Sequence, residues 1–137
     1  MAAALGIGQL ASIGEFLARK KAIAETYTRE LGEVPGIVSQ LAPSRNVDCS
    51  LWLSTILCED DSRPLLRHLA ADGIQTRPLW RPLTRLPYLR SCHVIEEEVA
   101  RSLAEKCLSL PCSVGLKDAE QASVIEKIRS YFHGTSR

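Results

Sequence analysis

Apolar side chains recur at three- and four-residue intervals through the first part of the chain, which is the spacing of one face of an α-helix. The series consists of Leu5, Leu10, Ile13, Phe16, Leu17, Ile23, Ala24, Tyr27 and Leu31. Gly32 follows as a C-terminal cap. We therefore expect one long helix from about Ala3 to Leu31, on the order of 40 Å long at 1.5 Å per residue. That is longer than a compact domain of this size needs.

The first turns of this helix are rich in small residues, among them Gly6, Gly8 and Gly14. Each glycine inside a helix costs ~1 kcal/mol relative to alanine. Two interpretations stay open: this end of the helix lies closely against another surface, or it is a frayed terminus.

A strand, a helix and a second strand are expected next, after a turn at Pro35-Gly36 and a polar loop at 42–46. Both faces of the segment Cys49 to Cys58 are largely apolar, as in a central strand covered on both sides. Acids at 59–61 and Ser62 mark the start of the helix, which Gly73 ends. The second strand runs from Ile74 to Leu79.

Two more helices and a short strand are expected in the last part of the chain. The glutamates at 96–98 open a helix that closes at Lys106, and its apolar face is Val99, Ala100, Leu103 and Ala104. Cys107 to Pro111 reads as an edge strand terminated by proline. Asp118 with Gln121 forms a capping-box pattern. The final helix then carries the apolar stripe Val124, Ile125, Ile128, Tyr131 and Phe132.

The composition is that of an ordinary globular domain. A chain of 137 residues with 45% hydrophobic and 24% charged residues fits one domain. The formal net charge of +1 gives no reason to expect a nucleic-acid or membrane partner through bulk electrostatics. No apolar run approaches the ~18 residues of a membrane span, and no secretion signal is visible at the N-terminus. We therefore expect a soluble, cytoplasmic protein.

The five cysteines are odd in number and include no C-x-x-C pair, so neither a disulfide framework nor a structural zinc site is indicated. The histidines lie far apart in sequence without metal-ligand spacing, and no lysine has the surroundings of a Schiff-base lysine. Phosphate-binding glycine motifs and nucleophile-elbow motifs are missing. The sequence therefore predicts no catalytic residue and no metal site.

One irregular segment, from Gly73 to Tyr88, gathers the groups that suit ligand binding. Its planar cations and aromatic rings are Arg77, Trp80, Arg81, Arg85 and Tyr88. Arginine forks bind phosphate or carboxylate through paired hydrogen bonds, and aromatic faces stack on flat or apolar rings. The alternative interpretation is a solvated basic loop in which Trp80 plugs the core.

Three segments in this order and at these separations resemble the C-terminal part of the DegT/DnrJ family of pyridoxal-phosphate-dependent nucleotide-sugar aminotransferases. They are Ala2 to Leu10, Gly73 to Trp80, and Leu108 to Pro111. The similarity covers nearly the whole chain. The segment from Gly73 to Tyr88 most resembles the branch that aminates UDP-linked keto-sugars in bacterial surface-glycan synthesis.

The resemblance implies an α+β fold, the small domain of a fold type I, aspartate aminotransferase-like enzyme. In that fold a long N-terminal helix is followed by a small, mostly antiparallel sheet packed with helices. Residues 1–137 would then form a single C-terminal small domain, in which 1–32 is a long connecting helix. In such enzymes the active site lies between the domains and between two subunits.

The resemblance also assigns substrate-binding residues. Arg77 and Trp80 match positions that would border the nucleotide-sugar pocket, and Arg81 and Tyr88 are further candidates. Thr84 stands where relatives often carry histidine, which is a departure from the family pattern. No catalytic or cofactor-binding residue of the family falls on this chain.

The family's large domain carries the pyridoxal phosphate, the Schiff-base lysine and the aspartate that pairs with the pyridinium nitrogen. It should precede Met1 and is absent from this sequence, so we expect the chain alone to be inactive. We also expect the small domain, without that cover, to expose apolar surface and to self-associate as a homodimer or larger assembly through the first helix.

Three interpretations stay open at this point. In the first, the chain is the C-terminal part of a sugar aminotransferase whose large domain is missing. In the second, it is a stand-alone oligomeric binding or interaction module that keeps the fold and has lost catalysis. In the third, it is an unrelated small-molecule-binding α+β regulator, which a first helix packed back onto a self-contained core would favour.

Overall fold

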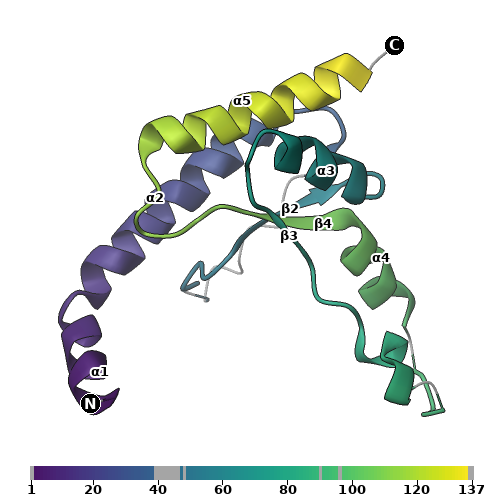
Figure 1. Cartoon of the computed structure of the whole chain (residues 1–137), viewed down its shortest axis with the longest axis horizontal. Coiled ribbons are helices and arrows are strands. Elements are labelled where there is room, and N and C mark those ends of the chain that lie inside the picture. Colours follow the sequence, from purple (N-terminus) through teal and green to yellow (C-terminus); the bar gives the residue numbers. More distant parts are fainter. Residues whose placement is uncertain (1, 39–46, 48, 90, 96, 136–137) are drawn as a thin grey trace.

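The computed structural model describes residues 2–38, 47, 49–89, 91–95 and 97–135, and the loop expected at 42–46 lies outside them. Its helices are α1 (Ala2–Ala11), α2 (Ile13–Leu31), α3 (Arg63–Ala71), α4 (Glu98–Lys106) and α5 (Asp118–Thr135). Its strands are β1 (Ile37–Val38), β2 (Ser54–Cys58), β3 (Arg77–Pro78) and β4 (Cys107–Leu110). Two 3₁₀ turns, η1 (Leu83–Arg85) and η2 (Pro87–Leu89), follow β3. Figure 1 shows their arrangement, which confirms the α+β class.

The described strands form one antiparallel sheet in the order β1-β2-β4-β3. The register aligns Ser54 with Leu110 across β2 and β4, and Arg77 with Ser109 across β3 and β4. The antiparallel arrangement and the central place of β2 are confirmed. The expectation of an edge strand at Cys107 to Pro111 is wrong, because β3 pairs with the other side of β4 and all four β4 residues are buried.

The strands are shorter than the sequence pattern predicts. The expected strand from Cys49 begins only at Ser54, and Leu51, with φ of 52°, lies in the left-handed region that interrupts extended backbone. The second expected strand, from Ile74 to Leu79, is only two residues long in the structure, Arg77–Pro78. Pro78 has no N–H to give to a neighbouring strand, which suits its place at the sheet edge.

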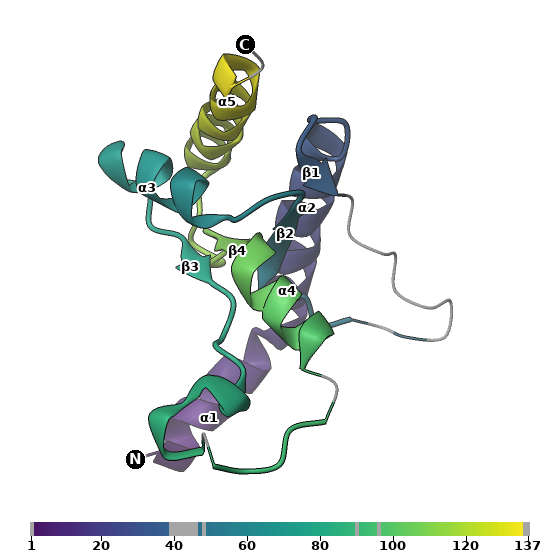
Figure 2. The same ribbon diagram turned by 90° about the vertical axis from the view of Figure 1, so that its right-hand side faces the viewer.

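The expected single long helix is interrupted at Ser12, which has φ of −105° and ψ of 6° and separates α1 from α2. Glycines at 8 and 14 flank this position and weaken the helix there. Gly32 does follow α2, yet its φ of −64° is ordinary helical backbone and does not require glycine. Figures 1 and 2 both show α1 projecting away from the sheet and from α5.

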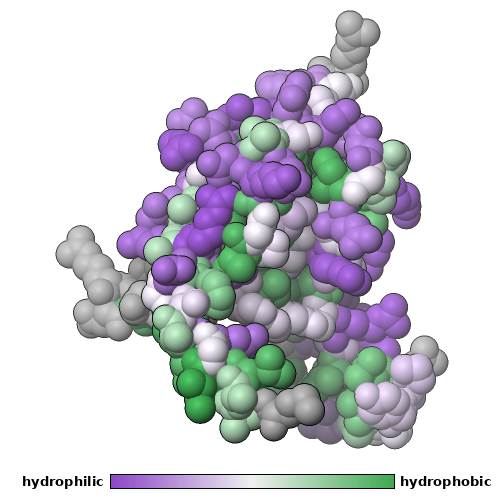
Figure 3. Space-filling view, turned by 60° about the vertical axis from the view of Figure 1, so that its left-hand side comes forward, coloured by the Kyte–Doolittle hydropathy of each residue, from purple (hydrophilic) through white to green (hydrophobic). Residues whose placement is uncertain are grey.

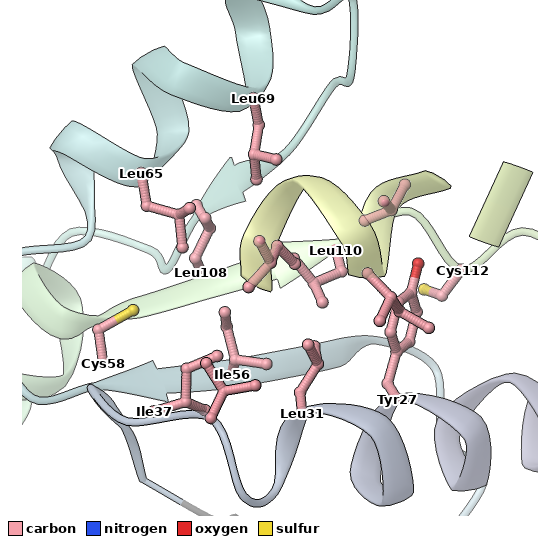
Figure 4. Close-up of a cluster of buried hydrophobic side chains, with 14 of the residues drawn as sticks. Tyr27, Leu31, Ile37, Ile56, Cys58, Leu65, Leu69, Leu108, Leu110 and Cys112 are labelled. Atoms are coloured by element: carbon pink, nitrogen blue, oxygen red, sulfur yellow. The ribbon is translucent and has the colours of Figure 1, made fainter. Parts of the chain in front are cut away.

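The core lies where α2, α3 and α5 meet the sheet (Figure 4). Its most deeply buried apolar side chains are Ile23, Leu31, Leu65, Leu69, Leu108 and Ile128. In Figure 4 Leu65 and Leu69 reach down from α3 toward Leu108 on β4. Val124, Ile125 and Ile128 of the expected α5 stripe are buried, whereas Tyr131 and Phe132 are half-buried. The second half of α2 therefore belongs to the core, but α1 does not.

Polar contacts define the helix ends. Gly73, with φ of 75°, ends α3, and the amides of Gly73 and Ile74 donate to the carbonyls of Ala70 and Leu69, which is the Schellman arrangement.

The expected capping box at Asp118, at the start of α5, is wrong. The Glu120 carboxylate instead accepts from the Lys117 N–H at 2.9 Å, while the Gln121 amide donates to the Ile23 carbonyl of α2 at 2.8 Å.

No helix among the described residues is both long enough and apolar enough to cross a membrane.

Truncating Leu108, which is fully buried, should destabilise the fold strongly. We expect Leu108→Ala to lower the free energy of unfolding by roughly 2–5 kcal/mol, because it removes apolar contacts and leaves a cavity at the centre of the sheet. The matched control is Leu83→Ala, since Leu83 is 69% exposed, and it should change stability by less than about 0.5 kcal/mol. Urea unfolding followed by circular dichroism measures both. Equal effects of the two substitutions would contradict this account of the core.

Candidate ligand-binding loop

The irregular segment after β3 is largely exposed. Trp80 is 65% exposed, so the interpretation of this side chain as a core plug is wrong. Prolines at 78, 82 and 87 limit the backbone freedom of the segment. The loop therefore presents its aromatic and cationic groups outward on a restricted backbone.

Trp80 stacks against Trp52, with ring centroids 5.8 Å apart and ring planes 24° from parallel. Trp52 is 68% exposed and lies in the irregular backbone before β2. The sequence pattern assigned Trp52 to a strand face, and the positive φ of Leu51 next to it is what removes it from the strand. No sequence signal links the two tryptophans, because their contact depends on tertiary structure.

The other candidate residues lie apart along the same segment. Arg77 is an exposed residue of β3, Arg81 precedes η1, and Tyr88 in η2 is 75% exposed. None of the three makes a side-chain hydrogen bond, ion pair or ring contact with another described residue. Their polar groups are thus available to a ligand.

Arg81 and Arg85 line a pocket of about 690 Å³ together with Arg63 of α3 and Arg101 of α4. The remaining lining residues are Pro78, Leu79, Pro82, Ala104 and Glu105. We call this the arginine pocket. Neither Arg63 nor Arg101 was a candidate from the sequence, because each is one exposed residue of a helix until the fold brings α3 and α4 to the loop.

Two of these arginines already have acidic partners. Arg85 donates to the Glu97 carboxylate at 2.5 Å, and this contact lowers the pKa of Glu97 below its ordinary value. Arg63 pairs with Asp61 at 3.1 Å. Arg81 and Arg101 form no ion pair with a described residue, although the charge of Arg101 also helps to lower the pKa of Glu97.

The groups beside this loop have surroundings that bear on their reactivity. Burial raises the pKa of the Cys58 thiol to about 11, so it stays protonated and unreactive at neutral pH. Lys20 donates to the backbone carbonyls of Trp52 at 2.6 Å and Cys112 at 2.7 Å. No group of three potential metal ligands occurs among the described residues. The exposed arginines and aromatic rings are the groups that suit an anionic, ring-containing ligand.

Known proteins resemble this chain over nearly its full length. It is 30% identical over 131 residues to the dTDP-4-dehydro-2,3,6-trideoxy-D-glucose 4-aminotransferase of Saccharopolyspora spinosa, covering 94% of this chain and 33% of that protein. It is 26% identical to the GDP-perosamine synthase of Escherichia coli O157:H7, covering 95% of this chain and 35% of that protein. The solved structure of the aminotransferase TlmJ from Streptoalloteichus hindustanus superposes with a TM-score of 0.90 at 26% identity, covering 98% of this chain and 36% of that one.

The chain spans about a third of the length of the curated relatives that it matches. Residues 1–129 match the DegT/DnrJ/EryC1/StrS aminotransferase family, which confirms the family that the three sequence segments indicated. The small antiparallel sheet with its packed helices is likewise shared with aminotransferases of known structure. This chain belongs to the DegT/DnrJ/EryC1/StrS aminotransferase family.

Proposed function

We propose that the chain is the C-terminal small-domain part of a pyridoxal-phosphate-dependent nucleotide-sugar aminotransferase. The observation that carries the proposal is the family match over residues 1–129 together with coverage of only about a third of each relative. In this proposal residues 1–137 form one domain, and residues 1–32, which contain α1 and α2, connect it to a large domain. A cytoplasmic location and a nucleotide-sugar substrate are parts of the same proposal.

Three lysines of this chain, at 20, 21 and 127, have partners that do not suit the role of the cofactor's Schiff-base residue. Pyridoxal phosphate acts as an electron sink once it is joined to a lysine amine, and that amine must be neutral to attack. Lys20 is held by two carbonyls, Lys21 lies 4.0 Å from Glu25, and Lys127 pairs with Asp72 at 3.1 Å. We therefore propose that the chain binds substrate groups but does not transaminate by itself.

The loop after β3 is the proposed nucleotide-sugar contact. Trp80, stacked on Trp52, offers an indole face for a flat or apolar ring. Arg77 and Arg81 offer guanidinium groups for phosphate oxygens, and Tyr88 adds an exposed phenol. The exposure of all four side chains supports this assignment.

A titration with a UDP-sugar tests the proposed contact. We expect saturable shifts of the backbone amide resonances between Gly73 and Tyr88, measured by heteronuclear NMR, because the ligand orders this segment. Arg77→Ala should weaken binding by roughly tenfold, the cost of one charge-assisted hydrogen bond. The matched control, Arg67→Ala, changes an exposed arginine on α3 outside the loop and should bind normally. Unchanged resonances at millimolar ligand would contradict a binding role for this loop in the isolated chain.

Apolar surface on the projecting helix supports self-association. Leu5, Ile7 and Leu10 of α1 are 68%, 71% and 68% exposed, and the series continues with half-exposed Ile13 and Leu17 on α2. Figure 3 shows apolar side chains gathered at the lower end of the molecule, where α1 lies. Contiguous apolar surface of this kind is uncommon on monomers. We propose that it packs against a second copy of the chain.

Sedimentation velocity at micromolar concentration tests this assembly. We expect a dimer or larger species for the unchanged chain and a monomer for the double variant Leu5→Glu with Leu10→Glu, because charges placed in an apolar interface stay desolvated. Leu83→Glu is the matched control, since Leu83 is as exposed as Leu5 but lies in η1. It should leave the assembly intact. A monomeric profile of the unchanged chain would refute the proposal.

The same surface favours a second candidate function, a stand-alone oligomeric binding or interaction module that keeps the aminotransferase fold. The expected first helix divides in two: α1 projects away from the core (Figures 1 and 2), whereas Ile23, Tyr27 and Leu31 of α2 are buried in it. Only α2 therefore meets the condition that would favour an unrelated regulator. Retained ligand binding together with stable self-association and no transaminase partner would favour the module over the enzyme part.

A further inference from the structure

One lysine side chain joins three segments that are distant in sequence. The Nζ of Lys20, on α2, donates to the carbonyl of Trp52 at 2.6 Å and to the carbonyl of Cys112 at 2.7 Å, and it lies 3.4 Å from the Cys112 sulfur. The thiol of Cys112 in turn donates to the Trp52 carbonyl at 3.7 Å. We call Lys20, Trp52 and Cys112 the lysine clamp. It fastens the irregular backbone before β2 to α2 and to the segment after β4.

Two members of the lysine clamp belong to the firmly packed part of the molecule. Further along α2 from Lys20, the buried Tyr27 donates its hydroxyl to the carbonyl of Pro111 at 2.8 Å. Pro111 directly follows β4, whose four residues are all buried, and Cys112 is buried as well. Lys20 and Cys112 are therefore fixed by the core, and Trp52 is the member that the clamp positions.

Trp52 has few other contacts that would hold it. Its backbone lies outside any strand, next to Leu51 with its positive φ of 52°, and its indole is 68% exposed. In the part of the chain that the structure describes, its hydrogen bonds come from Lys20 and Cys112, and its ring contact is the stack on Trp80. The attraction between two stacked, exposed rings is no larger than the conformational entropy lost when the backbone of one residue is fixed. The stack therefore needs the clamp to hold Trp52 in place.

We propose that Lys20 is a positioning residue, which holds the Trp52 indole in its stack with Trp80 and so prepares the ring surface of the ligand contact. A carbonyl in irregular backbone has no strand neighbour to donate to it, and the Lys20 ammonium supplies that donor through a charge-assisted hydrogen bond. Without Lys20 the Trp52 carbonyl would turn to water, and the backbone that holds the indole would sample other conformations. The effect on the stack stands on these contacts alone, whereas the effect on ligand affinity rests on the proposed function.

Circular dichroism measures the stack directly, because two coupled indoles give a paired positive and negative band and the chain contains two tryptophans. We expect this couplet in the unchanged chain and its loss in Trp80→Phe. Lys20→Met should also lose it, since methionine keeps an unbranched apolar side chain but has no N–H donor. Lys20→Arg should keep it, since a guanidinium can donate to both carbonyls. The matched control is Lys21→Met, because the Lys21 amine lies 4.0 Å from Glu25 and outside the clamp.

The UDP-sugar titration supplies the second readout. Lys20→Met should weaken binding by roughly tenfold, because the ligand must then order Trp52 itself, while Lys20→Arg and Lys21→Met should bind normally. Urea unfolding of each variant verifies that the fold is intact. A folded Lys20→Met variant that keeps the couplet would overturn the inference, and so would loss of the couplet with unchanged UDP-sugar affinity. If the unchanged chain does not bind the UDP-sugar, the proposed function fails, and the couplet alone decides the role of Lys20.

Discussion

The pairing of β4 with a strand on each side, and the burial that results, is the constraint on which the rest of the structure depends. Cys107–Leu110 lies between β2 and β3, and its four residues are all buried. Leu108 and Leu110 join the core formed with α2, α3 and α5. The Cys107 carbonyl at the start of the strand accepts from both Ser62 and Leu79. The strand that organises the core therefore also positions the helix and the loop from which the candidate binding groups project.

Much of the fold follows from local pattern, and the failures share one physical cause. Helical spacing predicted α3, α4 and α5, and Gly73 was correctly assigned as the end of α3, because these features depend on residues close in sequence. The role of β4 was wrong, since strand order depends on pairing between Arg77–Pro78 and Cys107–Leu110 that no local signal records. The break at Ser12 was missed because the apolar periodicity continues on both sides of it. The backbone nevertheless leaves the helical conformation at this residue.

The candidate site shows the same division between local and tertiary information. The sequence identified the segment from Gly73 to Tyr88, since prolines, arginines and aromatic residues are concentrated there. It did not identify Trp52, Arg63 or Arg101, which reach the loop only through the fold. The structure adds an exposed pair of stacked indoles and, beside it, a pocket lined by four arginines. The chain belongs to an aminotransferase family, and we propose that it supplies recognition while the chemistry needs a lysine from elsewhere.

The most direct test of the proposal that this chain lacks the catalytic lysine is a search for a specific pyridoxal phosphate adduct on the purified chain. The chain would be incubated with micromolar pyridoxal phosphate, reduced with borohydride and digested for mass spectrometry, with absorbance spectra recorded before reduction. The account predicts no saturable imine band and no lysine modified stoichiometrically. The amines of Lys20, Lys21 and Lys127 contact carbonyls or carboxylates, and neither Lys106 nor Lys117 lines the arginine pocket. A saturable band with one lysine fully modified would contradict it and make the chain a cofactor-binding protein by itself.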